Sequence, residues 1–215
     1  MQKKYGAALF DLDGVIVDTA RYHYLAWKAL AHELGFNFSE KDNERLKGIG
    51  RLESLEILLA VGGLSLPEAQ KQALAARKNE AFLSMVNHMS ASEILPGARQ
   101  LVRTLRQKHV RVALASSSRN APQVLKNLHI TEDFDAVIDG SMVELAKPHP
   151  QLFLLAAQKL GMAPADCVVF EDAQAGVQAA HAAGMFAVGV GAPGLLAGAD
   201  VLVPGLDAFD PQTLF

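Results

Sequence analysis

Residues 9–19 read LFDLDGVIVDT, and the apolar run from Ala7 to Phe10 leads directly into them. Asp11 and Asp13 are separated by one leucine and followed by Gly14. Side chains at positions i and i+2 of an extended chain point the same way, so both carboxylates are expected to face one small volume. Such carboxylates repel unless a cation lies between them or one acts as an acid and the other as a base. The alternative interpretation is a simple turn, because Asp and Gly are common turn residues.

Length and composition restrict the class of protein. The chain has 215 residues, half of them hydrophobic, and a formal net charge of -3. A chain of this size buries about 70% of its unfolded surface, enough for one sizeable domain or a core with an insertion. The charge does not favour a nucleic-acid partner, and no apolar stretch is long enough for a membrane helix. We therefore expect a monomeric cytoplasmic protein with a small-molecule ligand, without nucleic-acid or membrane partners.

Short apolar runs alternate with helical patterns along most of the chain. Runs that are apolar on both faces and rich in Val, Ile and Phe are typical of strands in a covered parallel sheet. Alternation of strand and helix predicts an α/β fold with a doubly wound, Rossmann-like parallel sheet. The predicted strands are residues 7–10, 110–115, 136–138, 167–170, 186–190 and 200–203. The helices predicted between them are 97–108, 120–128, 150–161 and 173–183.

One segment breaks this alternation. Residues 20–88 contain helical patterns at 22–34, 52–60 and 67–85 and no strand pattern. We interpret this segment as an all-helical insertion, with a core domain at residues 1–16 and 89–215 and a helical cap domain at residues 17–88. Short joints at about 15–18 and 87–95 would allow the two parts to hinge.

Reactive side chains also follow the second, third and fourth predicted strands. These are Ser116, then Lys147 before Pro148, then Glu171 and Asp172. The carboxyl ends of parallel strands meet at one edge of a sheet, where ligands bind. A carboxylate that attacks phosphorus, oxygen ligands for a hard cation, and a lysine and hydroxyl that hold phosphate oxygens together suit phosphoryl transfer.

Two other features are expected to have no part in chemistry. Cys167 is the only cysteine, which excludes an internal disulfide, and its apolar run CVVF favours a core position. Gly189, Gly191 and Gly194 spell GxGxxG after a predicted strand. A dinucleotide site requires this motif to open a helix, but the next predicted strand follows too closely, so we predict a loop.

The order of these motifs resembles the haloacid dehalogenase superfamily of phosphotransferases. The resemblance is carried by DLDGVIVDT, by Ser116 in LASSS, by Lys147-Pro148 and by VVFEDAQAG. The inserted segments TARYHYLAWKAL, LKGIGRLESL and LAARKNE are similar to cap segments of the β-phosphoglucomutase family. The resemblance implies an aspartyl-phosphate enzyme that uses Mg²⁺ and carries a helical cap.

The resemblance also implies roles for residues of the core. Asp11 would be the nucleophile, and Asp13 would be the general acid and base. Ser116 and Lys147 would hold the transferring phosphoryl group. The implied ligands of Mg²⁺ are Asp11, Asp13 through its backbone carbonyl, Glu171 and Asp172.

Further residues would bind the rest of a sugar phosphate. Thr19 and His23 would lie near the hinge, where His23 could couple substrate binding to the placement of Asp13. Trp27 and Lys78 would line the sugar. The specificity loop would comprise Lys47, Gly48, Arg51 and Ser54, with Arg51 on the non-transferring phosphate. The core would hold that phosphate through Ser117, Ser118 and Asn120.

Several of these assignments have a structural alternative. Trp27 suits the core of the cap equally well, and Lys78 could lie on a helix surface. Lys47 and Arg51 belong to a charged stretch that could be a solvated face. The polar residues Ser116, Ser117, Ser118 and Asn120 could simply cap the following helix.

The implied reaction is isomerisation, in which a phosphoryl group moves between O1 and O6 of β-glucose through a 1,6-bisphosphate. A sugar-phosphate phosphatase with the same core motifs is the alternative. A phospho-accepting switch domain is disfavoured because it would carry no helical insertion. A dehalogenase is disfavoured because it would not use the acidic metal site.

Overall fold

The computed structural model describes residues 4–46, 49–192, 194 and 196–215. These residues form two compact units. One unit contains the chain up to Asp18 and from Ser90 to Phe215, and the other contains Thr19–Met89. We refer to them as the core unit and the helical unit.

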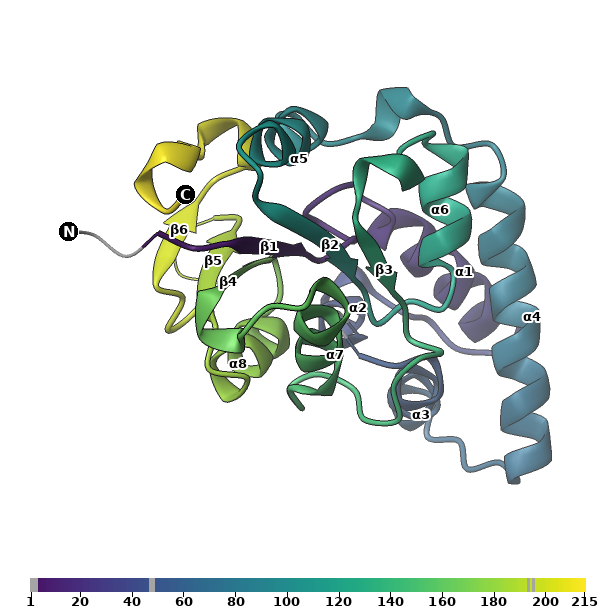
Figure 1. The fold of residues 1–215 in the computed structure, drawn as a ribbon. Helices are drawn as coiled ribbons and strands as arrows, with labels where there is room; N and C mark the ends of the chain where they lie inside the picture. The colour runs from purple at the N-terminus through teal and green to yellow at the C-terminus, as the bar shows by residue number, and fades with distance from the viewer. Residues whose placement is uncertain (1–3, 47–48, 193, 195) are drawn as a thin grey trace. The chain divides into compact units, whose positions relative to one another are not determined.

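A six-stranded parallel sheet forms the centre of the core unit, which confirms the predicted fold class (Figure 1). The spatial order is β3-β2-β1-β4-β5-β6, the order of a Rossmann-like doubly wound sheet. All six predicted strands are present, although the second and last begin one residue later than predicted. The strands are β1 (Ala7–Phe10), β2 (Arg111–Ala115), β3 (Ala136–Ile138), β4 (Cys167–Glu171), β5 (Phe186–Val190) and β6 (Val201–Val203).

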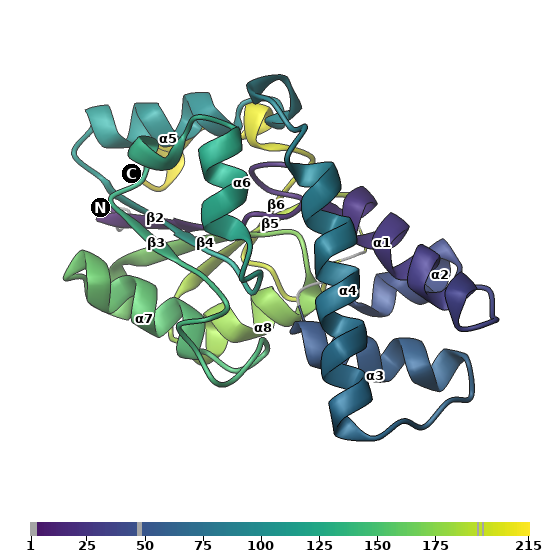
Figure 2. The same ribbon diagram turned by 90° about the vertical axis from the view of Figure 1, so that its right-hand side faces the viewer.

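Helices cover both faces of this sheet, which explains why the central strands are apolar on both sides. Figure 2 shows α5 and α6 on one face and α7 and α8 on the other. Leu9 and Val169 face α7 and α8, whereas Phe10 stacks on Phe170 on the opposite face, with ring centroids 4.6 Å apart. The helices are α5 (Ala98–Gln107), α6 (Ala121–Asn127), α7 (Gln151–Leu160) and α8 (Gln174–Ala182), close to the predicted ranges.

Short 3-10 turns complete the core unit. They are η2 (Ala91–Glu93), η3 (Thr131–Asp133), η4 (Pro164–Asp166), η5 (Leu206–Ala208) and η6 (Pro211–Thr213). The described residues between β5 and β6 form turns and bends, as predicted for the glycine-containing segment. Cys167 is buried in the apolar core, as predicted.

The helical unit contains α1 (Ala20–Glu33), α3 (Arg51–Val61) and α4 (Glu68–Val86), which confirms its three predicted helices. The prediction missed α2 (Glu40–Asn43) and η1 (Glu44–Leu46). A capping box begins α2, because Ser39 and Asp42 exchange hydrogen bonds between side chain and backbone. The stretch interpreted as a solvated face is therefore partly helical, and Leu46 is buried in the core of this unit.

The two chain connections between the units lie side by side within the core unit. Val17 forms an antiparallel bridge with Ile94, and the Leu95 N–H donates to the Ile16 carbonyl at 2.9 Å. Among the described residues, no helix has both the length and the apolar character needed to cross a bilayer.

Candidate active site

Backbone hydrogen bonds fix Asp11 at the carboxyl end of β1. Its N–H donates to the Phe170 carbonyl of neighbouring β4 at 3.0 Å, and the residue is 6% exposed. The chain then turns, since Gly14 has φ +73° and the Gly14 N–H donates to Val17. Asp13 lies within this turn and forms a parallel bridge with Val17. The DLDG stretch is therefore a turn, but one that begins with a buried carboxylate at the sheet edge.

Three carboxylates converge at this edge. Asp11, Glu171 and Asp172 each offer an oxygen, and these oxygens lie within 4.8 Å of one another. The cause is topological, because β1 and β4 are neighbours and Phe10 pairs with Phe170. The Asp13 side chain is not part of this group, which leaves its backbone carbonyl as the atom through which it would bind a metal.

Lys147 contacts two of the three carboxylates. Its fully buried side chain donates to Asp11 Oδ1 at 2.8 Å and to Glu171 Oε1. Burial acts to lower the pKa of Lys147, but the charges of Asp11 and Glu171 outweigh it and raise that pKa, so the ammonium persists. Burial raises the pKa of Glu171, and so does Asp11, while Lys147 and the Ala173 N–H oppose this.

The donor set fits a hard divalent cation. Three carboxylates and one ammonium leave two formal negative charges, which one divalent ion would balance. Carboxylate oxygens are the ligands that Mg²⁺ and Ca²⁺ take in proteins.

Two glycines make room for these carboxylates, a role that the sequence alone did not predict for either of them. A Cβ on Gly14 would lie 2.1 Å from Asp172 Oδ2, and one on Gly176 would lie 1.9 Å from Glu171 Oε1. Both glycines stand in the quoted motifs, but the need for glycine appears only when the carboxylates are placed.

The serine segment follows β2, as predicted. Ser116 is 1% exposed, and its N–H donates to the Ile138 carbonyl of β3 at 3.0 Å. Its Oγ accepts from the Ser118 N–H at 3.1 Å, and the Ser118 Oγ accepts from the Asn120 N–H at 3.2 Å. Asn120 precedes α6, but its side chain makes no capping bond, so the capping interpretation is wrong for Asn120.

Ser117 lies in the same segment, packed closely against the loop after β3. A Cβ on Gly140 would be 2.0 Å from the Ser117 carbonyl oxygen. This loop begins with Asp139, which is 5% exposed and accepts from the Ser141 N–H and hydroxyl at 2.7 and 2.6 Å. The loop leads to Lys147, so the serine segment and the Lys147 loop meet at Gly140.

In the helical unit, Lys78 is buried and not on a surface. It is 4% exposed, its Nζ lies 2.6 Å from His23 Nδ1, and it stands 4.5 Å above the Trp27 ring. An ammonium can only donate, so His23 Nδ1 accepts and its proton lies on Nε2. Burial, then Lys78, then Arg51 lower the pKa of His23. Trp27 is 2% exposed within the apolar core, in agreement with the structural alternative.

Arg51 and Ser54 lie in the first turn of α3, so they belong to a helix and not to a loop. Arg51 Nη2 donates to Asn79 Oδ1 of α4 at 2.8 Å, and Ser54 is buried. Thr19 immediately precedes α1 and is buried. Lys47 and Gly48, the other members of the predicted specificity loop, lie outside the described residues.

The structure thus forms two groups of predicted residues. One lies in the core unit around Lys147, and the other lies in the helical unit around Lys78.

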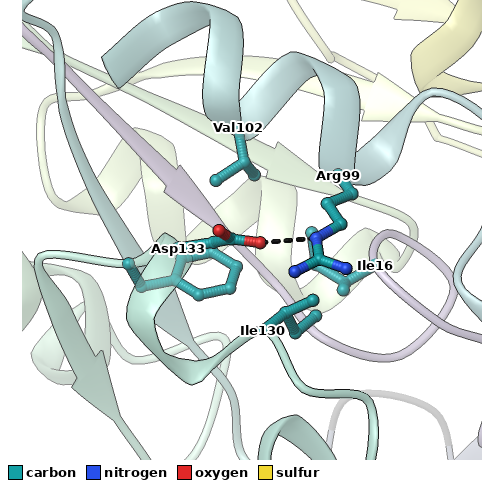
Figure 3. Close-up of a pocket in the computed structure, with 6 residues that line it drawn as sticks. Ile16, Arg99, Val102, Ile130 and Asp133 are labelled. Atoms are coloured by element: carbon teal, nitrogen blue, oxygen red, sulfur yellow. Dashed lines mark hydrogen bonds and ion pairs between the residues drawn. The ribbon is translucent and has the colours of Figure 1, made fainter. Parts of the chain in front are cut away.

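A separate small hollow of the core unit, below α5, contains the ion pair between Arg99 Nε and Asp133 Oδ2 at 2.7 Å (Figure 3). None of the predicted site residues lines this hollow.

Comparison with known proteins identifies the class to which this fold and site belong. The sequence profile of haloacid dehalogenase-like hydrolases matches residues 5–184. The chain belongs to this family, as its motifs predicted.

Individual members of the family resemble this chain over most of its length. The chain is 47% identical to a β-phosphoglucomutase of Bacillus subtilis over 92% of this chain and 88% of that protein. It is 37% identical to a fructose-1-phosphate phosphatase of Escherichia coli over 88% of this chain and 98% of that protein. A crystal structure of β-phosphoglucomutase from Clostridium difficile superposes with a TM-score of 0.94 at 40% identity, covering 97% of this chain and 94% of that one.

Proposed function

We propose that this protein is a β-phosphoglucomutase, which interconverts β-D-glucose 1-phosphate and β-D-glucose 6-phosphate through β-glucose 1,6-bisphosphate. The observation that carries the proposal is the 47% identity to a β-phosphoglucomutase, which extends over 92% of the chain. The phosphatase relative shares the family but is 37% identical.

In the proposed reaction, a carboxylate oxygen of Asp11 attacks the phosphorus on O1 of β-glucose 1,6-bisphosphate. The new O–P bond forms as the bond from phosphorus to O1 breaks, Asp13 gives O1 a proton, and β-glucose 6-phosphate is released. In the second half, the O6 hydroxyl of β-glucose 1-phosphate attacks the phosphoryl group on Asp11, Asp13 takes the hydroxyl proton, and the bisphosphate forms again as the phosphoryl group leaves Asp11. Ser116 and Lys147 hold the phosphoryl oxygens, and the contact of Lys147 with Asp11 at 2.8 Å supports this role.

Asp11, Glu171 and Asp172, with the Asp13 carbonyl, would hold Mg²⁺. When bound, this ion would reduce repulsion between the carboxylates and an incoming phosphate. The three carboxylate oxygens support a hard divalent cation. We propose Mg²⁺ among such cations because the family resemblance of the sequence motifs implies it.

We further propose that residues 17–88 act as a cap and residues 1–16 and 89–215 as the catalytic core. A mutase must keep water from its phosphorylated aspartate while the bisphosphate intermediate reorients. A cap that closes over the sugar supplies this exclusion. Arg51 would hold the non-transferring phosphate, with Lys47, Gly48 and Ser54 in the same specificity segment and Ser117, Ser118 and Asn120 on the core side. Lys78 would line the sugar, while Thr19 and His23 would lie near the hinge. We expect a cytoplasmic monomer.

Product identification tests the proposal. The protein is incubated with β-glucose 1-phosphate, Mg²⁺ and a trace of β-glucose 1,6-bisphosphate. We expect glucose 6-phosphate in large excess over inorganic phosphate, and we expect Asp11→Asn to form neither. Release of phosphate without glucose 6-phosphate would instead identify a sugar-phosphate phosphatase, which the similarity to the fructose-1-phosphate phosphatase would explain.

A further inference from the structure

Asn79 contacts the side chain on which phosphate binding by the helical unit would depend. It lies in α4, next to Lys78, and its Oδ1 accepts from Arg51 Nη2 at 2.8 Å. Both residues are half-buried. Arg51 begins α3, and α3 packs against α4, so the contact joins two helices of one unit.

Asn79 lies at the edge of the buried stripe of α4. Ala75 and Phe82, one helical turn to either side, are 3% and 0% exposed. The packing of this stripe therefore fixes the backbone that carries the Asn79 amide. A fixed acceptor is able to restrict a flexible side chain such as arginine before any ligand arrives.

The chemistry of the Asn79 amide suits the ordering of Arg51 before a ligand binds. A guanidinium presents several N–H donors in a rigid fork, so a hydrogen bond to one of them restricts the orientation of the others. An amide oxygen is neutral and leaves the charge of Arg51 intact. A carboxylate at position 79 would pair with the guanidinium and compete with a phosphate for it.

We propose that Asn79 is a positioning residue that orders Arg51 for the non-transferring phosphate of the substrate. The inference rests on the proposed function, in which Arg51 binds that phosphate. Ordering Arg51 in the free protein lowers the entropy lost on binding, so Asn79 acts on affinity and not on the chemical step.

The first test compares Asn79→Ala and Asn79→Asp with a control on the same helix, Gln72→Ala, which removes an exposed amide that donates to Glu68 at 2.8 Å. Asn79→Ala is expected to raise the KM for the sugar phosphate about tenfold, the effect of one hydrogen bond to a charged group, with little change in kcat. Asn79→Asp keeps the shape and acceptor but adds a charge, and it should raise KM by a further factor of about ten. Gln72→Ala should change neither constant.

A second substrate separates positioning from general damage. Acetyl phosphate has one phosphate, which the core would transfer to Asp11 without help from Arg51. Phosphorylation of the protein by acetyl phosphate should proceed at the same rate in all four proteins. A slower rate in Asn79→Asp, the variant of unchanged shape, would overturn the inference.

A double-mutant cycle with Arg51→Ala provides the decisive comparison. Once Arg51 is absent, Asn79→Ala should have no further effect on KM, so the two changes should be strongly non-additive. Additive effects would show that Asn79 acts independently of Arg51 and would overturn the inference. If the unmutated protein forms no glucose 6-phosphate, the proposed function fails by itself, and the cycle is then measured on whichever sugar phosphate is hydrolysed.

Discussion

Replacing Gly176 by alanine tests the geometry of the acidic group most directly. The added Cβ would lie 1.9 Å from Glu171 Oε1 and 2.0 Å from Glu171 Cδ, so the carboxylate must move. It cannot move without loss, because Ala173 N–H donates to Oε2 at 2.8 Å and Lys147 binds Oε1. Glycine to alanine usually stabilises a helix, but in this variant it also disturbs a buried charged contact.

The sizes of the opposing contributions decide whether Gly176→Ala stabilises or destabilises the protein. Alanine in place of glycine within α8 would contribute about 1 kcal/mol of helix propensity. Overpacking a core costs about 1 to 3 kcal/mol, and weakening a hydrogen bond to a charged group costs about 1.5 to 3 kcal/mol. The free energy of unfolding should therefore fall by about 1.5 to 5 kcal/mol, which lowers Tm by about 3 to 20 °C in a chain of this size.

Thermal unfolding and activity as a function of Mg²⁺ concentration are the two measurements. Gly176→Ala should be less stable and should require more Mg²⁺ for half-maximal activity, because Glu171 is displaced. Gln178→Ala is the control, since Gln178 is exposed on the same helix. An unchanged or higher Tm together with an unchanged Mg²⁺ requirement would refute the position assigned to the Glu171 carboxylate.

Three further predictions concern Lys147, the metal and His23. Lys147→Met should lower the rate of phosphoryl transfer from acetyl phosphate about 100- to 1,000-fold, as expected for loss of a preorganised charge contact; a rate near that of the unmutated protein would contradict its role. A chelator should abolish glucose 6-phosphate formation and added Mg²⁺ should restore it, whereas chelator-insensitive turnover would exclude a required metal. The pKa of His23 is lowered in the folded protein. As the pH falls below about 6.5, His23 therefore binds a proton in the unfolded chain but not in the folded one, and the free energy of unfolding decreases. Urea unfolding between pH 7.5 and about 5 should show this loss weakened in His23→Asn; an equal loss in both proteins would assign it to other groups.

The sheet could be predicted from sequence because a parallel strand with two covered faces leaves a short continuous apolar run. The group at its edge could also be predicted, since topology alone brings the ends of adjacent strands together. Asp11 and Glu171 are 160 positions apart in the chain, yet β1 and β4 are hydrogen-bonded neighbours. The parallel direction of the strands predicted a shared edge, and the strand order of the structure makes the two residues neighbours.

Residues that act by filling or leaving space were not predictable in this way. The requirement for glycine at position 176 arises from the Glu171 carboxylate, which approaches only after α8 packs on the sheet. Lys78 was ambiguous because a single lysine in a helical pattern is usually exposed, and its burial depends on Trp27 and His23 of another helix. The hydrogen bond from Arg51 to Asn79 leaves no signal in either local sequence.

The hydrogen bonds of Lys147 and Arg51 have acceptors of different charge. Lys147 contacts Asp11 and Glu171, so two carboxylates hold its ammonium beside the nucleophile. Arg51 donates to the Asn79 amide oxygen, which is a neutral acceptor. A carboxylate in its place would pair with the guanidinium and compete with a phosphate for it. Exchanging the two kinds of partner, as Asn79→Asp does for Arg51, should therefore impair substrate capture while leaving the chemistry at Asp11 intact.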